Sequence, residues 1–167
     1  DIADMTIADA VGAVLSNARA SLRFMSNGKI GVFEDEVKTV SRQLFTPSNS
    51  KNFSGQRIFP TYPDAIRVKF VAAEADYEAV ECLVYADGKN DSNADSNTFE
   101  DLTLFGVTDY FHAWRLGRYH MAAAIWRQET FSLTVGLENL VSQRGDRVEV
   151  AHDVPKLGGM SARGMDV

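Results

Sequence analysis

The sequence predicts an α+β fold in which a small helix–hairpin lobe accompanies a β-rich lobe, barrel- or sandwich-like, packed on one long helix. Three patterns lead to this prediction. Apolar residues recur at three- and four-residue steps within residues 108–127, as in an amphipathic helix. Apolar and polar residues alternate in several short runs elsewhere, as in half-buried strands. An Asn27-Gly28 pair separates two such runs near the N-terminus and is typical of a hairpin turn.

The composition limits the class of protein. The chain has 167 residues, 45% hydrophobic and 24% charged, which indicates a globular chain with a real core. Its net charge of −6 disfavours sequence-independent binding of nucleic acid, because such binding requires a surplus of Lys and Arg. No apolar run has the roughly 18–20 residues of a membrane span. The lone Cys82 permits no internal disulfide, and the start at Asp1 leads us to expect a fragment of a longer protein.

Residues 1–44 are predicted to form the helix–hairpin lobe. Thr6 and Asp9 have the spacing of a capping box, with the acid where the helix dipole favours it. The helix should end near residues 17–19, and its apolar face would be Ile7, Val11, Val14 and Leu15. A hairpin follows on either side of Asn27-Gly28, with the apolar residues Leu22, Phe24, Ile30 and Val32.

Residues 45–63 are predicted to be a turn-rich linker or arm. The sequence after Phe45 is dense in turn formers, and Pro60 and Pro63 disfavour helix before them. A loop of this length inside a compact domain is unusual unless it has a function. Its spaced aromatic residues would anchor it to a surface of this chain or of another chain; they are Phe45, Phe53, Phe59 and Tyr62.

Residues 64–167 are predicted to form the β-rich lobe around the central helix. The first two of its strands should pair as a hairpin, and a turn at residues 144–146 should precede the last strand. A polar loop is expected at residues 87–97. The predicted strands are residues 66–71, 80–85, 99–105, 131–135 and 147–150.

The central helix, residues 108–127, is the longest predicted element. Thr108 stands where an N-cap is expected, because its hydroxyl can accept a hydrogen bond from a backbone N–H of the first turn. Gly117 costs the helix about 1 kcal/mol relative to Ala, so we expect another part of the backbone to approach closely there. The predicted buried stripe consists of Phe111, Trp114, Met121 or Ala122, and Ile125.

No motif for catalysis or for a cofactor is visible. His112 and His120 stand eight residues apart, too far for the i, i+4 pair of a helical zinc site. Residues 87–95 carry oxygen ligands at alternate positions, as calcium loops do, but lack the glycine and the distal glutamate of an EF-hand. Acidic runs at residues 34–36 and 74–78 could supply paired carboxylates, although such runs are common on strand edges. We therefore expect neither an enzyme nor a bound cofactor or metal.

Arg115 and Arg118 mark the polar side of the central helix. Exposed ion pairs contribute only about 0–1 kcal/mol each, so stability alone does not account for them. The two arginines fit either a solvated face or a surface complementary to an acidic partner. The sequence leaves both interpretations open.

Several phrases, in order along most of the chain, resemble the tail-tip or host-specificity protein family of long-tailed, lambda-like bacteriophages and prophages. No single phrase is a catalytic signature, so the resemblance rests on their cumulative order. The last two are the most specific. The phrases are residues 27–32, 45–49, 59–60, 65–70, 84–88, 106–109, 113–120, 129–131 and 144–153.

This resemblance implies a piece of the central hub of a phage tail tip. Proteins of the family are large and typically trimeric, so the expected partners are copies of the same chain and other phage tail proteins. The expected location is the virion tail tip, after synthesis in the bacterial host cytoplasm. A receptor- or glycan-binding module with Trp114 or Trp126 as its platform is the alternative, followed by a cell-wall hydrolase. The expected interface residues are Phe45, Phe53, Phe59, Tyr62, Tyr110, Arg115 and Arg118.

Overall fold

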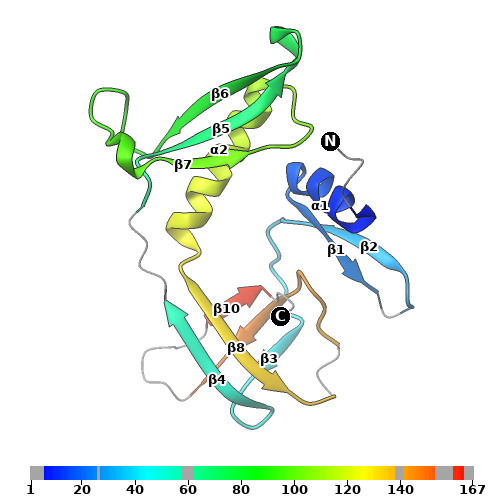
Figure 1. The fold of residues 1–167 in the computed structure, drawn as a ribbon. Coiled ribbons are helices and arrows are strands. Elements are labelled where there is room, and N and C mark those ends of the chain that lie inside the picture. The colour runs from blue at the N-terminus through cyan, green and yellow to red at the C-terminus, as the bar shows by residue number, and fades with distance from the viewer. Residues whose placement is uncertain (1–5, 26, 58–61, 138–140, 153–159, 164–167) are drawn as a thin grey trace. The chain divides into compact units, whose positions relative to one another are not determined.

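The fold is taken from a computed structural model that describes residues 6–25, 27–57, 62–137, 141–152 and 160–163. The chain divides into two compact units (Figure 1). The first unit contains residues 1–17 and 57–129, and the second contains residues 18–56 and 130–167. These divisions differ from the expected boundaries at residues 44 and 63, because the chain passes between the units three times. The α+β class is confirmed, and the described strands form no closed barrel.

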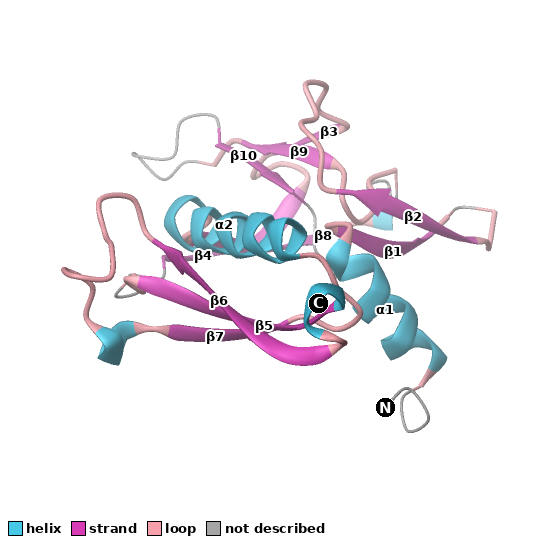
Figure 2. Ribbon diagram, turned by 90° about the horizontal axis from the view of Figure 1, so that it is seen from above, coloured by secondary structure: helices cyan, strands magenta, loops and turns pink. Residues whose placement is uncertain are grey.

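The first unit is a three-stranded sheet covered on one face by a helix (Figure 2). Its strand order is β6-β5-β7, in which β5 pairs antiparallel with β6 and parallel with β7. The predicted hairpin and the further strand are therefore confirmed. The elements are α1 (Ile7–Asn17), β5 (Ala65–Ala72), β6 (Glu78–Tyr85), β7 (Glu100–Thr103) and α2 (Tyr110–Trp126), with short 3-10 turns at Ala73–Ala75 and Ser96–Thr98.

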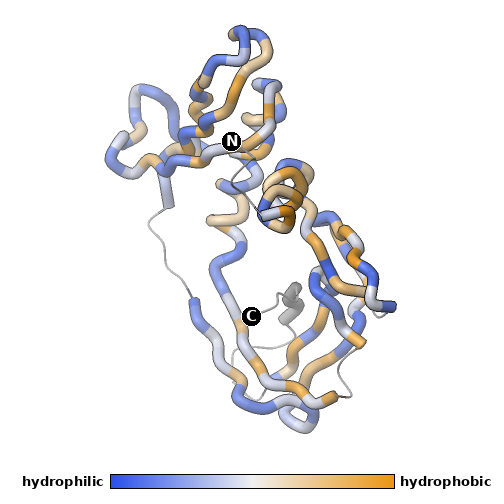
Figure 3. The backbone as a smooth tube through the Cα atoms, turned by 45° about the vertical axis from the view of Figure 1, so that its right-hand side comes forward, coloured by the Kyte–Doolittle hydropathy of each residue, from blue (hydrophilic) through white to orange (hydrophobic). Residues whose placement is uncertain are grey.

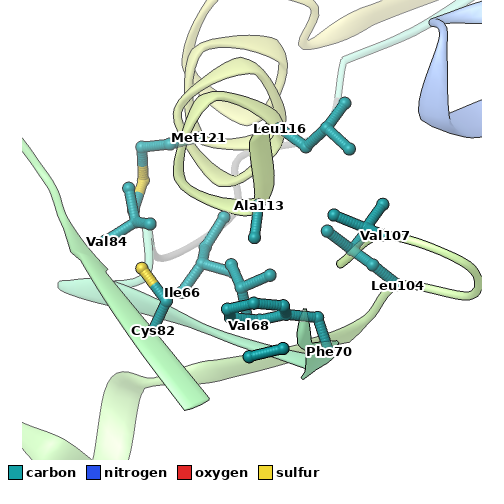
Figure 4. Close-up of a cluster of buried hydrophobic side chains, with 11 residues drawn as sticks. Ile66, Val68, Phe70, Cys82, Val84, Leu104, Val107, Ala113, Leu116 and Met121 are labelled. Atoms are coloured by element: carbon teal, nitrogen blue, oxygen red, sulfur yellow. The ribbon is translucent and has the colours of Figure 1, made fainter. Parts of the chain in front are cut away.

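The core of the first unit lies between α2 and the sheet (Figure 4). Strand alternation sends Ile66, Val68 and Phe70 of β5 toward the helix. The helix packs Ala113, Leu116, Gly117 and Met121 against these side chains. At Gly117 the sheet is so close that a Cβ would lie 2.7 Å from Val84 Cγ2 and 2.8 Å from Val68 Cγ2. The close approach expected at Gly117 is confirmed, although valine side chains rather than a backbone make it.

The face of α2 that is buried differs from the predicted stripe. Ala113, Leu116, Gly117 and Met121 are buried, whereas Phe111 is 70% exposed and Trp114 42% exposed. The prediction of those two aromatics as core residues is wrong, whereas Met121 is buried as predicted and Ile125 packs against the core cluster. The helix turns Gly117 toward the sheet, because the side chains of Val68 and Val84 leave no room there for a Cβ. The N-cap is also not Thr108 but Asp109, whose carboxylate accepts the N–H of His112 at 2.7 Å.

Helix α1 begins and ends where the sequence predicts. Thr6 Oγ1 accepts the Asp9 N–H at 3.2 Å and donates to the Asp9 carboxylate at 2.6 Å, which confirms the capping arrangement. At its other end Asn17 donates to the Phe105 carbonyl at 2.6 Å, and the Asn17 carbonyl lies 3.0 Å from His112 Nε2. No residue of α1 is buried, so its apolar face, unlike that of α2, lacks a cover within the described chain.

The polar loop after β6 is organised by its own hydrogen bonds; its hydrophilic residues form a blue stretch in Figure 3. Asp64 accepts the backbone N–H of Asp95 and the Lys89 ammonium group, both at 2.9 Å. The Asp95 N–H, followed by Lys89, holds the pKa of the Asp64 carboxyl below its usual value. In the described part of the chain no group of three or more His, Cys, Asp or Glu residues is placed to hold a metal ion.

The second unit is built from strands alone among its described elements. A hairpin of β1 (Ala20–Phe24) and β2 (Ile30–Glu34) confirms the predicted turn, where Gly28 has a φ of +75°. A three-stranded sheet has the order β10-β9-β3, in which β3 is parallel and β10 antiparallel to β9. The remaining strands are β3 (Gln43–Phe45), β4 (Ser50–Arg57), β8 (Glu129–Val135), β9 (Arg147–Val150) and β10 (Met160–Arg163).

Strand β4 corrects the prediction of an irregular arm over residues 45–63. The turn after Phe45 is present, and the Asn49 side chain accepts the Thr46 N–H at 2.7 Å and donates to the Leu44 carbonyl at 3.0 Å. Residues 50–57 then pair with β8. The polar sequence of these residues does not predict a strand, because the strand depends on pairing with β8, which is distant along the chain. Gly55 leaves room for the Phe131 ring of β8.

A buried carboxylate ties together segments of the second unit that lie far apart in sequence. Asp146 is 5% exposed and lies 3.7–3.9 Å from charged nitrogens of Arg23, Lys38 and Arg42. Its other contact is local, because Asp146 Oδ2 accepts the Gln143 N–H at 3.0 Å. These cations come from β1 and from the segment before β3, so the Asp146 cluster, defined by these four charged residues, joins the hairpin to the β9 turn.

The turn that carries Asp146 also packs closely against the hairpin. Gly145 has a φ of +86°, and a Cβ there would lie 2.3 Å from Phe33 Cδ2. The next residue, Arg147, donates through Nη1 to the carbonyls of Lys38 and Thr39 at 3.1 and 3.0 Å. The predicted turn thus holds the second unit together through a ring contact, a charge cluster and two backbone contacts.

Two internal helix glycines provide a matched test of the packing in the first unit. Gly117→Ala should destabilise the chain by about 1–3 kcal/mol, because the new methyl group meets two buried valines. Gly12→Ala should stabilise it by about 0.5–1 kcal/mol, because nothing lies within 4 Å of that position and Ala favours helix. Urea unfolding followed by circular dichroism measures both. Equal effects of the two changes would contradict the described packing.

The Asp146 cluster predicts a large cost for removing one charge. Asp146→Asn keeps the shape but leaves three cations facing each other, so we expect a loss of about 3 kcal/mol of unfolding free energy. Glu149→Gln is the control, because its 3.8 Å pair with Arg147 is exposed and should change stability by less than about 1 kcal/mol. Thermal and urea unfolding of both variants would show whether Asp146 has this role.

Candidate protein–protein interface

The outward face of α2 carries the largest exposed side chains of the first unit. Phe111 and Trp114 project from its first half, and Trp126, 83% exposed, ends it. Large exposed apolar side chains gathered on one element are typical of contact surfaces, where aromatic residues and Arg are enriched. We call the set Phe111, Trp114, Arg115, Arg118 and Trp126 the α2 outward face.

The two arginines of this face differ in how they are held. Arg118 donates to the Tyr85 carbonyl at 3.1 Å and to the Asp87 carboxylate at 2.8 Å, and its guanidinium lies 6.0 Å from the centre of the Trp114 ring. It is therefore oriented by the sheet. Arg115 is exposed and has no hydrogen bond or ion pair to any other described residue. Of these two arginines, Arg115 has all of its guanidinium N–H groups available to a partner protein, whereas Arg118 already donates from both Nη1 and Nη2.

Tyr110 begins α2 and stands between the core and the outward face. Its ring meets Phe70 edge-on at 6.3 Å and Phe111 at 5.9 Å. The hydrogen bond between its hydroxyl and the buried Cys82 thiol raises the pKa of Tyr110, with burial as a smaller cause. The Tyr110 ring therefore packs within the first unit on one side, and its exposed part could also contact a partner protein.

Tyr62 lies near the other end of α2. Its hydroxyl accepts a hydrogen bond from the side-chain amide of Gln128, which also donates to the Ile125 carbonyl at 2.7 Å. Close by in sequence, Arg57 and Glu129 form an exposed pair at 3.6 Å. These contacts fix the residues that follow α2, and they leave the Tyr62 ring partly exposed.

Two of the expected interface aromatics belong instead to the core of the second unit. Phe45 is 7% exposed and packs with Val148 and Val150, strands β3 and β9 being neighbours. Phe53 stacks on Phe131 at 5.8 Å and on the His152 ring at 4.4 Å. Of the two surfaces to which Phe45 was expected to anchor its segment, it packs on one of this chain, because pairing with β9 turns it inward. Phe59 lies outside the described residues.

The structure therefore brings together Tyr110, Arg115 and Arg118 on α2, with Tyr62 near its end, whereas Phe45 and Phe53 belong to the second unit. Sequence reasoning placed Phe111 and Trp114 in the predicted core, and it named Trp114 and Trp126 only as the platform of the alternative binding module. The small residues could have given the signal. Ala113 and Gly117 stand four residues apart and so share one face of the helix, which small residues mark as the packed face. The aromatic residues on the other side of the helix then point outward.

The histidines and membrane propensity add little to the site. Burial lowers the pKa of His120, whose ring meets Tyr119 edge-on at 5.5 Å. Among the described residues no helix is both long and apolar enough to cross a membrane.

Comparison with known proteins assigns the chain to a family. The sequence profile of a family described as "Putative phage tail protein" matches residues 5–165. The chain belongs to this phage tail protein family. Membership indicates a structural tail component that is associated with the virion. None of the curated proteins matches this sequence.

A solved structure shares the fold of this phage tail protein. It is the crystal structure of the tail protein from Neisseria meningitidis MC58, with a TM-score of 0.62 and 11% sequence identity. The match covers 93% of this chain and 48% of that chain, so this phage tail protein spans about half the length of its structural neighbour. At this identity the likeness shows the fold alone.

The exposure of the two tryptophans is directly measurable. Trp126 should have a solvent-like emission maximum and be strongly quenched by acrylamide, because most of its surface meets water. Trp114 should be quenched less, since Arg118 lies against its ring. Measuring the variants Trp114→Phe and Trp126→Phe separates the two signals. A blue-shifted, protected Trp126 would show that something covers the α2 outward face.

Proposed function

We propose that this phage tail protein is a scaffold segment of the central hub at the tail tip, that it works in a trimer, and that it acts through protein contacts rather than catalysis. The family match to residues 5–165 supports the tail assignment. The proposed position at the tail tip and the proposed trimer rest on the resemblance to the lambda-like tail-tip family, which lies in the order of the shared phrases along the sequence. The α2 outward face is the observation that carries the contact role, because its aromatics and Arg115 lie outside the core cluster of the first unit and are exposed.

The physical basis of this role is burial of exposed apolar surface between protomers. Stable obligate contacts bury large and more apolar surfaces, and cyclic symmetry requires each protomer to offer complementary patches. The charged outer face of the β6-β5-β7 sheet is less suited to such a contact. Lys69 and Arg67 lie 2.7 and 3.3 Å from Asp101, so its charges are already paired with each other.

Immunogold labelling of phage particles tests the tail-tip role. An antibody against this chain should label the distal end of the tail, and particles made without the chain should lack a closed tip. Label along the tube, or at the end near the head, would contradict the tip assignment. Absence of the chain from purified particles would contradict any structural role in the virion.

Changing the α2 outward face should separate assembly from folding. Phe111→Ser combined with Trp126→Ser should leave the circular dichroism spectrum and melting temperature nearly unchanged, because both side chains are mainly in solvent. Incorporation of the chain into tails, measured by complementation and mass spectrometry, should fall at least tenfold. Tyr77→Ser is the control, since Tyr77 is equally exposed but lies in the β5–β6 turn away from α2. Normal incorporation of the double variant would rule out this face.

The exposed tryptophans also favour one second function, a glycan- or receptor-binding module. Exposed Trp rings can stack on sugars, and burial of both would have counted against this idea. If this reading is correct, host cell-wall oligosaccharides should shift the tryptophan emission, and Trp126→Ala should abolish the shift. Particles carrying that variant would then assemble normally but fail to adsorb to the host.

A further inference from the structure

Helix α1 exposes a continuous apolar and small surface. Ile7 is 85% exposed, Val14 is 60% exposed, and Val11 is more than one-third exposed. At 100° per residue, Ala8 and Gly12 extend this surface around the helix, and Asp9 lies at its far edge. Most of the half-buried residues of α1 lie on the other side, at Ala10, Ala13 and Asn17. Leu15, near the C-terminal end of the helix, is half-buried as well and lies on the same side as Val11, so the exposed surface is the part before it. We call Ile7, Ala8, Val11, Gly12 and Val14 the α1 face.

Gly12 indicates that a neighbour belongs on the α1 face. A glycine inside a helix costs about 1 kcal/mol relative to Ala. At Gly117 that cost is offset by the valines that pack directly on the helix, but a Cβ at Gly12 would have nothing within 4 Å. Within the described chain Gly12 therefore has no packing reason. A second helix that approached α1 closely would supply one.

The α2 outward face complements the α1 face in size. Its Phe111, Trp114 and Trp126 are large, whereas the α1 face offers Gly12, Ala8 and aliphatic side chains. Large rings pack well over glycine and alanine because these allow two helix axes to come close.

The two surfaces are also opposite in charge. Helix α1 (Ile7–Asn17) contains Asp9 and no Lys or Arg. Residues 110–126 contain Arg115 and Arg118 and no Asp or Glu. Arg115 is exposed and makes no ion pair with the described residues, and Asp9 is exposed and uses one oxygen for Thr6. Asp9 and Arg115 are thus available to each other.

We propose that the α1 face of one copy packs on the α2 outward face of a second copy of this chain, with Asp9 paired to Arg115. The two patches differ, so the contact is head-to-tail, and repetition of such a contact around an axis closes a ring. The inference rests on the proposed scaffold function. An 11-residue helix on a 17-residue helix falls short of the roughly 1,200 Å² of a standard interface, so the contact adds to others and is weak alone.

Cross-linking between chains that each carry one accessible cysteine detects a contact of this strength. The native Cys82 is buried, so Val11→Cys and Trp114→Cys each add one accessible thiol. When chains of different tag length are mixed under mild oxidation, the Val11→Cys chain should join the Trp114→Cys chain. This should occur at least tenfold faster than Val11→Cys joins itself. Val37→Cys, at a position of the second unit that is 92% exposed, is the control partner for Trp114→Cys. Equal rates in all mixtures would overturn the proposal.

A charge exchange tests the pairing of Asp9 with Arg115. Asp9→Lys or Arg115→Asp alone should slow the cross-link at least fivefold, and chains that carry both changes should regain the original rate. Circular dichroism checks that α1 stays helical in each variant. Two slow single variants without recovery in the double variant would overturn the pairing.

Failure of this contact is distinguishable from failure of the proposed function. If cross-linking fails but immunogold still labels the tail tip, the hub role stands and the copies meet elsewhere. If the cross-link forms but the label lies away from the tip, the contact stands and the tip assignment fails.

Discussion

The close approach of α2 to its sheet is the constraint on which the first unit depends. Val68 and Val84 reach the helix at Gly117, so the middle of α2 can present only small or slender side chains to the sheet. The face of α2 that contains Ala113 and Gly117 lies against the sheet, so Phe111 and Trp126 lie on the opposite side of the helix. The exposed aromatics of α2 are therefore a direct consequence of how tightly the core is packed, and they give this phage tail protein its candidate contact surface.

The second unit depends less on a close-packed apolar core than the first unit does, and more on a buried charge cluster. Its apolar core is small, with Phe45, Val148 and Val150 as its buried members. A buried carboxylate with three cations around it, and a glycine turn under Phe33, connect the hairpin to the sheet. A buried charge cluster of this kind favours one arrangement of its segments, because every other arrangement leaves charges unpaired in a poor solvent for them. The same turn was visible in the sequence, but its partners were not.

Much of the fold follows from local sequence. The capping residues of α1, the hairpin around Asn27-Gly28, the hairpin of β5 and β6, and the extent of α2 depend on residues within a few positions of one another. Local pattern also placed Arg115 and Arg118 on the polar side of α2. It failed for β4, whose polar sequence becomes a strand only because β8 pairs with it, and for the buried face of α2.

The sequence by itself determined the periods, caps and turns of this phage tail protein, because these obey the short-range stereochemistry of the backbone. The tertiary structure alone decided which face of each element is covered. Apolar spacing on α2 fits two faces, the aromatic one and the small-residue one, and only the distance to Val68 and Val84 selects between them. It also decided that Phe45 lies in a core while the face of α1 remains open, because burial depends on partners that are distant along the chain.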